Sequence, residues 1–453
     1  MKNSLSSKTI LEPAREVKVC KEADVVVVGG GPAGVAAAVA AARTGANTVL
    51  VERYGHLGGL ATGGLVIVIM PMSDGTKEQQ IAGLCQEMVD RLDARGAAIH
   101  PRKEDLGSSD NQLVSYWRRY PFSVVEGKLI MGVSFDPEAL KCVLNDMVEE
   151  TGVKLFLHSW GTKAIIDHGK VQGIIFESKS GRQAILGKVI VDTTGDGDIY
   201  ASAGADFDST VDPKNSRANL ALVFRIGNID MKRYTEFRES ELPRYTELMR
   251  ELSSLGGLTM YIRTSREDVI WVNNQIPGRH GLNVEDLTWV EVNVRKRMLI
   301  THDFLKKYIP GFEKSFIMDT ASQIGVRCTR RLIGEYVLTE KDILSGVIHP
   351  DTIAVCPHFR HNVSVEHPHW HIPYRSLVPR KIDNLLVAGR CFSSDPVANE
   401  MCDPIQFCIA MGQAAGTAAA LATKHSVAAR DVDHKELQGC LVKQGVPLPS
   451  IPV

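Results

Sequence analysis

The stretch ADVVVVGGGPAG, residues 23–34, predicts the fold of this chain. Residues 24–28 are apolar and mostly β-branched, as in a short parallel strand that is buried on both faces. A glycine-rich turn follows, and residues 32–43 continue as an alanine-rich helix. Residues 48–51, TVLV, predict a second strand, so the segment has the order strand, helix, strand.

Three glycines of the turn have the spacing G-x-G-x-x-G, which is typical of dinucleotide sites. Gly29 permits the tight turn, Gly31 lets the backbone approach a pyrophosphate, and Gly34 lets the helix pack closely on the strand. Pro32 and Ala33 begin the helix, whose free N–H groups and dipole favour an anion. We therefore predict a diphosphate at this helix N-terminus.

An acidic residue follows the second strand. Glu52 lies eighteen positions after Gly34, close to the roughly 20-residue offset at which a carboxylate meets a ribose hydroxyl. A turn of the same shape without a nucleotide is the alternative. The strand, the helix and the acid together favour the nucleotide.

Length and composition restrict the class of protein. A chain of 453 residues is long for one core, so two interleaved domains are expected. The formal net charge of −1 indicates no nucleic-acid partner, and no run approaches the roughly 20 apolar residues of a membrane span. Nine cysteines without a C-x-x-C motif argue against disulfide scaffolds and structural zinc, and no signal peptide is evident. We expect a cytoplasmic protein.

A glycine-rich loop, residues 55–64, follows the predicted ribose contact. Its five glycines would let the backbone come close to a cofactor, whereas a flexible surface loop is the alternative. The apolar segment 65–70 directly after it makes a surface loop less suitable. The cofactor contacts predicted here are Arg53, Gly58, Gly59 and Thr62.

These segments resemble a known family. GGGPAGVAAAVAAARTGANTVLVER, residues 29–53, followed by HLGGLATGG, residues 56–64, looks like the glutathione-reductase-type FAD flavoproteins. Within them it resembles the FAD-dependent oxidoreductase family related to fumarate reductase-like and thiazole-synthase-like proteins. The resemblance implies FAD rather than NAD, with Glu52 on the adenosine ribose.

Two later segments are similar to further signatures of this family. Short strands predicted over residues 153–191 lead into DTTGDGD, residues 192–198, similar to the second FAD-contacting signature. A calcium loop is the alternative reading, but the remaining EF-hand ligands are missing. Residues 372–395 and the helix 406–423 resemble the third signature, and the glycines within 412–416 would let this helix lie against the first one. The contacts implied are Thr194, Gly195, Asp196, Gly389, Arg390, Asp395 and Gln406.

Arginines and histidines are the candidates for chemistry. GVRCTRRLIGEY, residues 325–336, resembles an arginine-bearing signature, and Arg330 could clamp a carboxylate or pair with an acid of the protein. Residues 356–371 contain five of the fourteen histidines. His369 and His371 are predicted to handle a substrate proton, because imidazole titrates near neutrality. There are two alternatives for this row of histidines: a metal site that includes His367, or a polar face of a strand. Of these readings we favour the proton-handling role, and we predict no bound metal. Arg375 and Arg390 are further candidates for orienting an anion.

The predicted fold class is α/β: a Rossmann-type FAD-binding domain built from discontinuous segments, with an inserted mixed α+β substrate domain. Residues 107–133 are expected to be irregular, either touching substrate or forming a solvated loop. The FAD-binding domain is predicted to comprise residues 1–75, 136–215 and 376–430, the substrate domain residues 76–135 and 216–375, and the tail residues 431–453.

The predicted function is hydride transfer between a small organic substrate and flavin N5, with reoxidation by oxygen or an external electron acceptor. One alternative runs in reverse and reduces an activated double bond, as fumarate-reductase-like enzymes do. Another is a non-redox flavoprotein with a partner- or tRNA-binding role. No second G-x-G-x-x-G follows a strand, so a built-in NAD(P)H domain is not expected. A homo-oligomer is possible.

Overall fold

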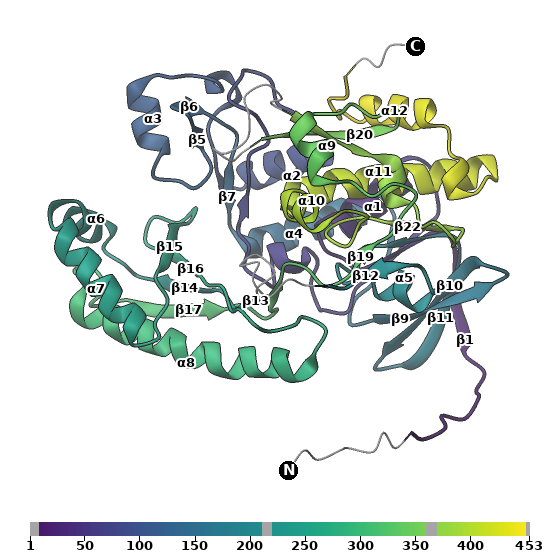
Figure 1. Cartoon of the computed structure of the whole chain (residues 1–453), viewed down its shortest axis with the longest axis horizontal. Helices are drawn as coiled ribbons and strands as arrows, with labels where there is room; N and C mark the ends of the chain where they lie inside the picture. The colour runs from purple at the N-terminus through teal and green to yellow at the C-terminus, as the bar shows by residue number, and fades with distance from the viewer. Residues whose placement is uncertain (1–8, 211–219, 359–368, 450–453) are drawn as a thin grey trace.

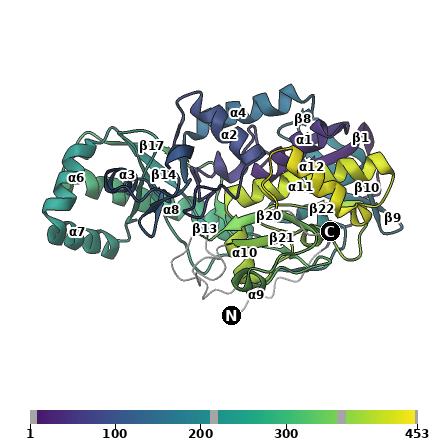
Figure 2. The same cartoon turned by 90° about the horizontal axis from the view of Figure 1, so that it is seen from above.

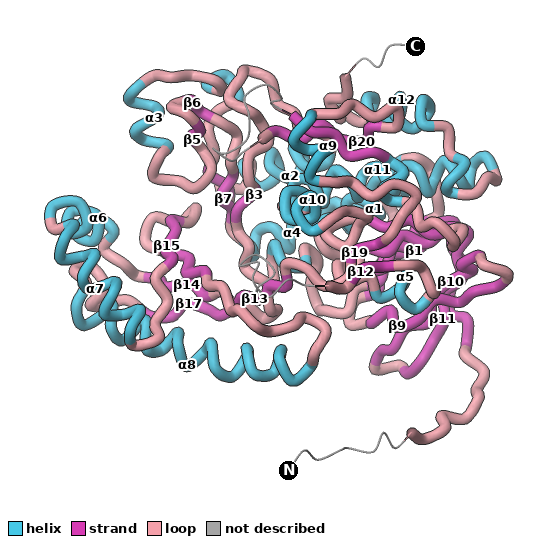
Figure 3. Tube along the Cα trace, in the orientation of Figure 1, coloured by secondary structure: helices cyan, strands magenta, loops and turns pink. Residues whose placement is uncertain are grey.

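The computed structural model describes residues 9–210, 220–358 and 369–449. Figure 1 shows a larger part around helices α1 and α11 and a smaller part formed by α6, α7 and α8 with their strands. Figure 3 shows the strands β1, β9, β10 and β11 gathered in the larger part, while helices cover one side of the smaller part. The fold is α/β, with a Rossmann-type domain assembled from discontinuous segments.

The main sheet has the strand order β8-β2-β1-β11-β10-β9, with β22 also paired to β11. The central neighbours β2, β1, β11 and β22 run parallel, whereas β9, β10 and β11 pair antiparallel. The inner residues are buried on both faces, which explains the unbroken apolar runs in the sequence. The bounds are β1 Lys18–Val28, β2 Thr48–Val51, β8 Lys154–Phe156, β9 Trp160–Asp167, β10 Lys170–Ser178, β11 Gly181–Asp192 and β22 Leu385–Val387.

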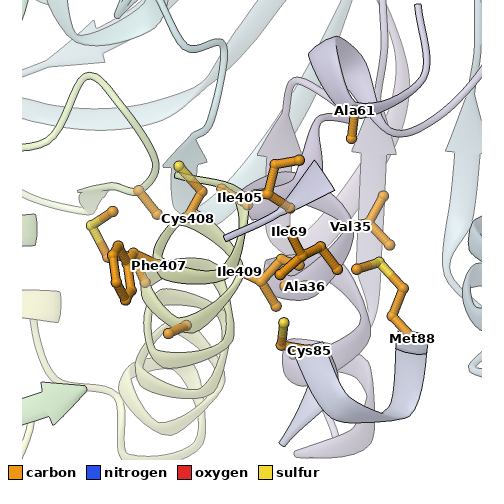
Figure 4. Close-up of a cluster of buried hydrophobic side chains, with 14 of the residues drawn as sticks. Val35, Ala36, Ala61, Ile69, Cys85, Met88, Ile405, Phe407, Cys408 and Ile409 are labelled. Carbon is orange, nitrogen blue, oxygen red and sulfur yellow. The ribbon is translucent and has the colours of Figure 1, made fainter. Parts of the chain in front are cut away.

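Two helices pack across this sheet, α1 (Pro32–Arg43) and α11 (Ile405–His425). A Cβ at Gly412 would lie 2.1 Å from the Ala33 carbonyl oxygen, and one at Gly416 would lie 2.0 Å from that of Ala37. These two glycines therefore let the helix backbones touch, as the sequence predicted. Figures 2 and 4 show the two helices side by side, and Figure 4 shows apolar side chains of both, such as Ala36 and Ile409, close to one another.

Helix α11 is a correction to the sequence analysis, which found no run long enough for a membrane span. Its 21 residues reach a mean hydropathy of 1.3 over an 18-residue window, so length and composition would allow a crossing. The whole window is buried inside the protein. Its apolar character is therefore that of a core helix.

The smaller part is built on a second sheet with the order β15-β16-β14-β17. Trp271 in β16 donates a hydrogen bond from Nε1 to the Leu65 carbonyl oxygen at 2.6 Å, which joins the two parts. Asn283 caps α8 by accepting hydrogen bonds from the backbone N–H groups of Glu285 and Asp286 in its first turn. The bounds are β14 Phe224–Gly227, β15 Met260–Arg263, β16 Ile270–Asn273, β17 Phe316–Thr320, α6 Met231–Ser240, α7 Leu242–Ser254 and α8 Val284–Tyr308.

Residues 107–133, predicted as irregular, contain a helix and a hairpin. Asp110 caps α3 (Asn111–Trp117) by accepting hydrogen bonds from two backbone N–H groups. Val114 and Trp117 pack on Leu129 of the hairpin in a small separate apolar cluster. The prediction was wrong because the helix is short and its stability comes from this cluster rather than from a long apolar period.

The remaining elements are short strands and the helices outside these two groups. The predicted boundaries between domains stay a prediction. The bounds are β3 Val68–Ile69, α2 Leu84–Asp93, β4 Ala98–Ile99, β5 Val124–Val125, β6 Lys128–Leu129, β7 Val133–Phe135, α4 Pro137–Glu150, α5 Asp198–Ser202, β12 Phe207–Asp208, β13 Leu220–Ala221, β18 Gly325–Val326, β19 Arg331–Leu332, α9 Glu340–Ser345, β20 Thr352–Pro357, β21 His369–Pro373, α10 Pro396–Cys402 and α12 His434–Lys443.

Candidate functional site

A cavity of about 1050 Å³, partly open to solvent, lies at the carboxyl ends of the parallel strands. Its wall includes the last residues of β1 and β2, Val28 and Val51, and the residues just after β11 and β22, Thr193 and Ala388. Open α/β sheets bind ligands in the crevice at this edge.

The glycines of the first turn have different roles. A Cβ at Gly29, where φ is +102°, would lie 2.5 Å from the Thr193 carbonyl oxygen, and one at Gly34 would lie 1.7 Å from that of Gly29. Both positions therefore require glycine for the protein's own packing. Gly31 lines the cavity, and a Cβ there would meet no protein atom within 4 Å. The open space lies where a ligand can approach the backbone and the N-terminus of α1.

One end of the cavity is formed by the residues after β2. Glu52 accepts hydrogen bonds from the backbone N–H groups of Gly30 (2.6 Å) and Tyr54 (2.7 Å), and its burial raises its pKa. The Arg53 guanidinium lies 4.8 Å from the centre of the Tyr54 ring. Trp160, at the start of β9, also lines this end although 53% of it is exposed. Two aromatic side chains and a guanidinium suit a flat ring.

The middle of the wall holds a buried ion pair. Arg390 donates from Nη2 to Asp196 Oδ1 at 2.7 Å, and Thr329 donates to the same oxygen at 2.8 Å. Burial alone would raise the pKa of Asp196, but the charge of Arg390 and these hydrogen bonds hold it below its ordinary value. Nη1 of Arg390 has no hydrogen-bond partner in the described part of the chain. Arg390 therefore has a donor available for a ligand.

The other end of the cavity lies at the N-terminus of α11. Ile405 and Cys408 of its first turn form the wall, together with Asp403 and Gln323. The Cys408 thiol donates to the Asp403 carbonyl oxygen at 3.2 Å, and burial raises its pKa to about 12, so it is protonated at neutral pH. Gln323 is only 5% exposed, and its Nε2 has no hydrogen-bond partner among the described residues. Free backbone N–H groups of α11 favour negative charge at this end.

The structure places most of the predicted cofactor contacts in this wall. Each contact stays a prediction, because proximity to the cavity does not show that a residue touches the cofactor. Those in the wall are Gly29, Gly31, Pro32, Ala33, Glu52, Arg53, Gly59, Thr194, Gly195, Asp196, Gly389 and Arg390. Those outside it are Gly34, Gly58, Thr62, Asp395 and Gln406.

The predicted contacts outside the wall have structural partners. Thr62 donates to the Leu57 carbonyl oxygen at 2.6 Å, and Asp395 caps α10. Gln406 donates from Nε2 to the Pro71 carbonyl oxygen at 3.4 Å. The wall also contains Tyr54, Trp160 and Gln323, which sequence reasoning did not find. No local motif marks these three, because each reaches the cavity from a different loop or strand end.

The predicted catalytic histidines do not line the cavity wall. His369 Nε2 lies 2.8 Å from Asp74 Oδ2. Burial alone would raise the pKa of Asp74, but hydrogen bonds from His369 and Thr76 lower it to about 2. His371 is 7% exposed, and burial, followed by the neighbouring His369 and His349, lowers its pKa to about 4.

Two contacts join the Asp74–His369 pair to α11. Pro71, three residues before Asp74, accepts the hydrogen bond from Gln406. Trp370, next to His369, packs edge-on against Phe407 with ring centres 5.3 Å apart. Ile405 and Cys408 of the same turn reach the cavity. Asp74 and His369 themselves lie outside the cavity wall, on segments whose neighbouring residues contact the first turn of α11.

The predicted arginines are engaged with acids. Arg375 contacts both oxygens of Asp351, at 3.1 and 3.2 Å. Arg330 donates from Nη1 to the Asp196 carbonyl oxygen (2.8 Å) and to Asp198 (3.0 Å), both of which belong to cavity-lining residues. Of these two, only Arg330 is in contact with the wall of the cavity.

No group of three or more metal-ligating side chains lies together within residues 9–210, 220–358 and 369–449. His367 lies outside the described residues. All nine cysteines are free thiols, and five of them are buried.

The residues of the cavity wall suit the chemical groups of a dinucleotide such as FAD. Open space above Gly31 faces the N-terminus of α1, aromatic side chains line one end, and the N-terminus of α11 lies at the other. Arg390 has a donor without a protein partner between them. These residues therefore fit a diphosphate flanked by two ring systems.

Comparison with known proteins gives a family match over most of the chain. The family described as FAD dependent oxidoreductase matches residues 24–441. Digeranylgeranylglycerophospholipid reductase 2 of Methanopyrus kandleri is 24% identical over 174 residues, and the match covers 38% of this chain and 38% of that protein.

Two solved structures are similar over nearly the whole chain. A geranylgeranyl bacteriochlorophyll reductase-like protein from Thermoplasma acidophilum is 15% identical, with coverage of 94% of this chain and 82% of that one and a TM-score of 0.46. The p-nitrophenol 4-monooxygenase PnpA from Pseudomonas putida DLL-E4 is 14% identical, with coverage of 93% and 84% and a TM-score of 0.47.

Proposed function

This chain belongs to the FAD-dependent oxidoreductase family, and on that basis we propose that it transfers a hydride between a small organic substrate and FAD held in the cavity at the strand ends. The observation that supports the site is the open space above Gly31, which lines a cavity running from Glu52 to the N-terminus of α11. When bound, FAD supplies the N5 atom that accepts or returns the hydride.

The residues of the wall would hold the cofactor. The turn at Gly31 and the N-terminus of α1 would bind the diphosphate. Glu52 lies at the ribose end, where its two carboxylate oxygens already accept backbone N–H groups, so it also fixes the turn itself. Arg390 would donate its spare N–H to the cofactor, and Asp196 holds the guanidinium in place.

We assign the proton step to the Asp74–His369 pair rather than to His371. His371 has a pKa of about 4 because it is buried, so it is neutral at pH 7 and a weak base. His369 is partly exposed, and Asp74 accepts its ring N–H, which would fix the tautomer and the orientation of the imidazole. Arg330 is the candidate that would neutralise a substrate anion, because it contacts the cavity wall.

The proposal also includes a relationship to glutathione-reductase-type and fumarate reductase-like proteins. It further includes oxygen or an external carrier as the electron acceptor, a cytoplasmic location and assembly as a homo-oligomer. Reduction of a carbon–carbon double bond is the second candidate function, and the matched relative, which is named a reductase, favours it.

The experiment is an anaerobic screen of the FAD-loaded protein, with flavin absorbance as the readout. Acids, alcohols, amines and sugar derivatives are tested for bleaching of oxidised flavin, and alkenes for reoxidation of reduced flavin. With the active compound, His369→Ala should slow the reaction roughly 100-fold or more, the range of general acid–base catalysis. His425→Ala, which changes an exposed histidine paired with Glu436, is the matched control. If no compound or reductant changes the flavin, the non-redox alternative is correct.

A further inference from the structure

A second hollow lies in the smaller part of the molecule, between the segment that follows α3 and the elements α6 and β15. It consists of two adjoining cavities of about 1040 and 800 Å³ that share residues such as Arg119, Tyr120 and Arg263. Figure 1 places α3, α6 and β15, and Figure 2 places α3 and α6, on the side of the molecule away from α1 and α11. None of its lining residues belongs to the wall of the FAD cavity.

Four arginines line the smaller of the two cavities, Arg118, Arg119, Arg238 and Arg263, together with the acid Glu239, and the adjoining cavity adds Lys232, Arg266, Glu236 and Glu267. We call this region the arginine groove. None of the four has a carboxylate within ion-pair distance in the described ranges. Arg263 donates to the Thr235 hydroxyl at 2.8 Å, and the guanidinium groups of Arg119 and Arg238 lie over tyrosine rings.

Many arginines elsewhere in the described residues are paired with an acid. Arg225, Arg331, Arg375 and Arg390 are each paired with an aspartate, and acids and bases are almost equal in number, with a net charge of −1. Four unpaired guanidinium groups around one concave surface repel one another and are stabilised by an anion. Guanidinium forks bind phosphate or carboxylate groups with two parallel hydrogen bonds.

The floor of the arginine groove is apolar. Tyr234 and Ile270 are buried beneath it, and Tyr261, Ile262 and Met231 line it as well. An inorganic ion bound by the arginines would make no contact with these apolar side chains. An apolar or ring-shaped body placed on them, with its charged group among the arginines, would use both features.

We propose that the arginine groove is a second binding site, for an organic anion that has an apolar or aromatic body and a phosphate or carboxylate group. The site is separate from the FAD cavity and does not depend on the redox function. Arg263 and Arg238 hold the charged group, and the tyrosine-lined floor takes the body of the ligand.

The test uses the full-length protein and four probes in calorimetric titrations: 1-naphthyl phosphate, 1-naphthoate, 1-naphthol and inorganic phosphate. We expect one of the two naphthalene anions to bind with a Kd below about 1 mM and more tightly than naphthol or inorganic phosphate. Which of the two binds better identifies the charged group. Added salt should weaken binding.

The double variant Arg238→Gln, Arg263→Gln should weaken that binding at least tenfold. Arg233→Gln is the matched control on the same helix, because Arg233 is paired with Glu313 and does not line the groove. Melting temperature and FAD content, measured for every variant, separate loss of the site from loss of the fold. The proposal is overturned if neither naphthalene anion binds, if the control variant loses as much affinity, or if inorganic phosphate binds equally well. The last outcome would mean that the apolar floor contributes nothing.

Discussion

The substitution Gly31→Ala should separate folding of this protein from binding of its cofactor. Gly31 has φ −68° and ψ −175°, an extended conformation that alanine adopts without strain. Its new methyl group would meet no protein atom within 4 Å. Replacing glycine at such a position stabilises a protein by about 0.4–1 kcal/mol through the unfolded chain, so the apoprotein should be unchanged or slightly more stable.

The same methyl group would project into the space that we assign to the diphosphate. Forcing a methyl group into a well-packed contact costs about 1–3 kcal/mol, which corresponds to a roughly 5- to 150-fold weaker Kd for FAD. Thermal unfolding of the apoprotein and titration of FAD by quenching of its fluorescence measure the two quantities separately.

Gly34→Ala is the contrasting variant. Its Cβ would lie 1.7 Å from a backbone carbonyl oxygen, so the apoprotein itself should lose stability. The reasoning fails if Gly31→Ala destabilises the apoprotein as much as Gly34→Ala does. It also fails if Gly31→Ala binds FAD with the affinity of the unchanged protein.

Three further predictions concern other parts of the molecule. Gly416→Ala places a Cβ 2.0 Å from a carbonyl oxygen of α1 and should reduce the free energy of unfolding by about 1–3 kcal/mol. Gly439→Ala on α12 is the control: its Cβ meets no atom within 4 Å, and the variant should raise the free energy of unfolding by roughly 0.5–1 kcal/mol. Urea unfolding measures both variants. The pKa of His371 is about 4 in the folded protein, against an ordinary 6.5, so the unfolded chain takes up this proton at a higher pH than the folded protein does. The free energy of unfolding should therefore fall by on the order of 3 kcal/mol as the pH is lowered from 6.5 to 4. His371→Phe should flatten the pH dependence of urea midpoints over that interval, and an unchanged slope would contradict the assignment. Asp74→Asn should leave FAD binding intact and slow flavin reduction at least about tenfold, because His369 loses the partner that orients it; equal rates would remove the pair from the mechanism.

Local signals in the sequence predicted the parts of the fold whose contacts are close along the chain. The strands 24–28 and 48–51 and the helix after Gly31 were found because turn chemistry and apolar runs mark them. The N-terminal half of β1 was missed. Its residues are charged and exposed, and it is a strand because it pairs with the long strand β11.

The parts of the site that lie close to a sequence motif were also predictable. The glycine-rich and acidic motifs after the parallel strands identify the wall residues that follow each strand. Gln323 and Trp160 reach the same cavity from distant segments and have no motif around them. Arg375 is held by Asp351, and Arg330 is held near Asp196, more than a hundred residues earlier. Such partners are selected by the three-dimensional fold, not by spacing in the sequence.

The contact between α1 and α11 also has a consequence for synthesis of the protein on the ribosome. Residues 32–43 leave the ribosome long before residues 405–425, although each helix covers the other through their glycines and alanines. During that interval the alanine-rich face of α1 has no native partner, and the cofactor cavity lacks one of its ends. Contacts of such sequence separation form late and leave apolar surface exposed meanwhile. The nascent chain should therefore depend on chaperones until α11 emerges, and FAD should bind after translation rather than during it.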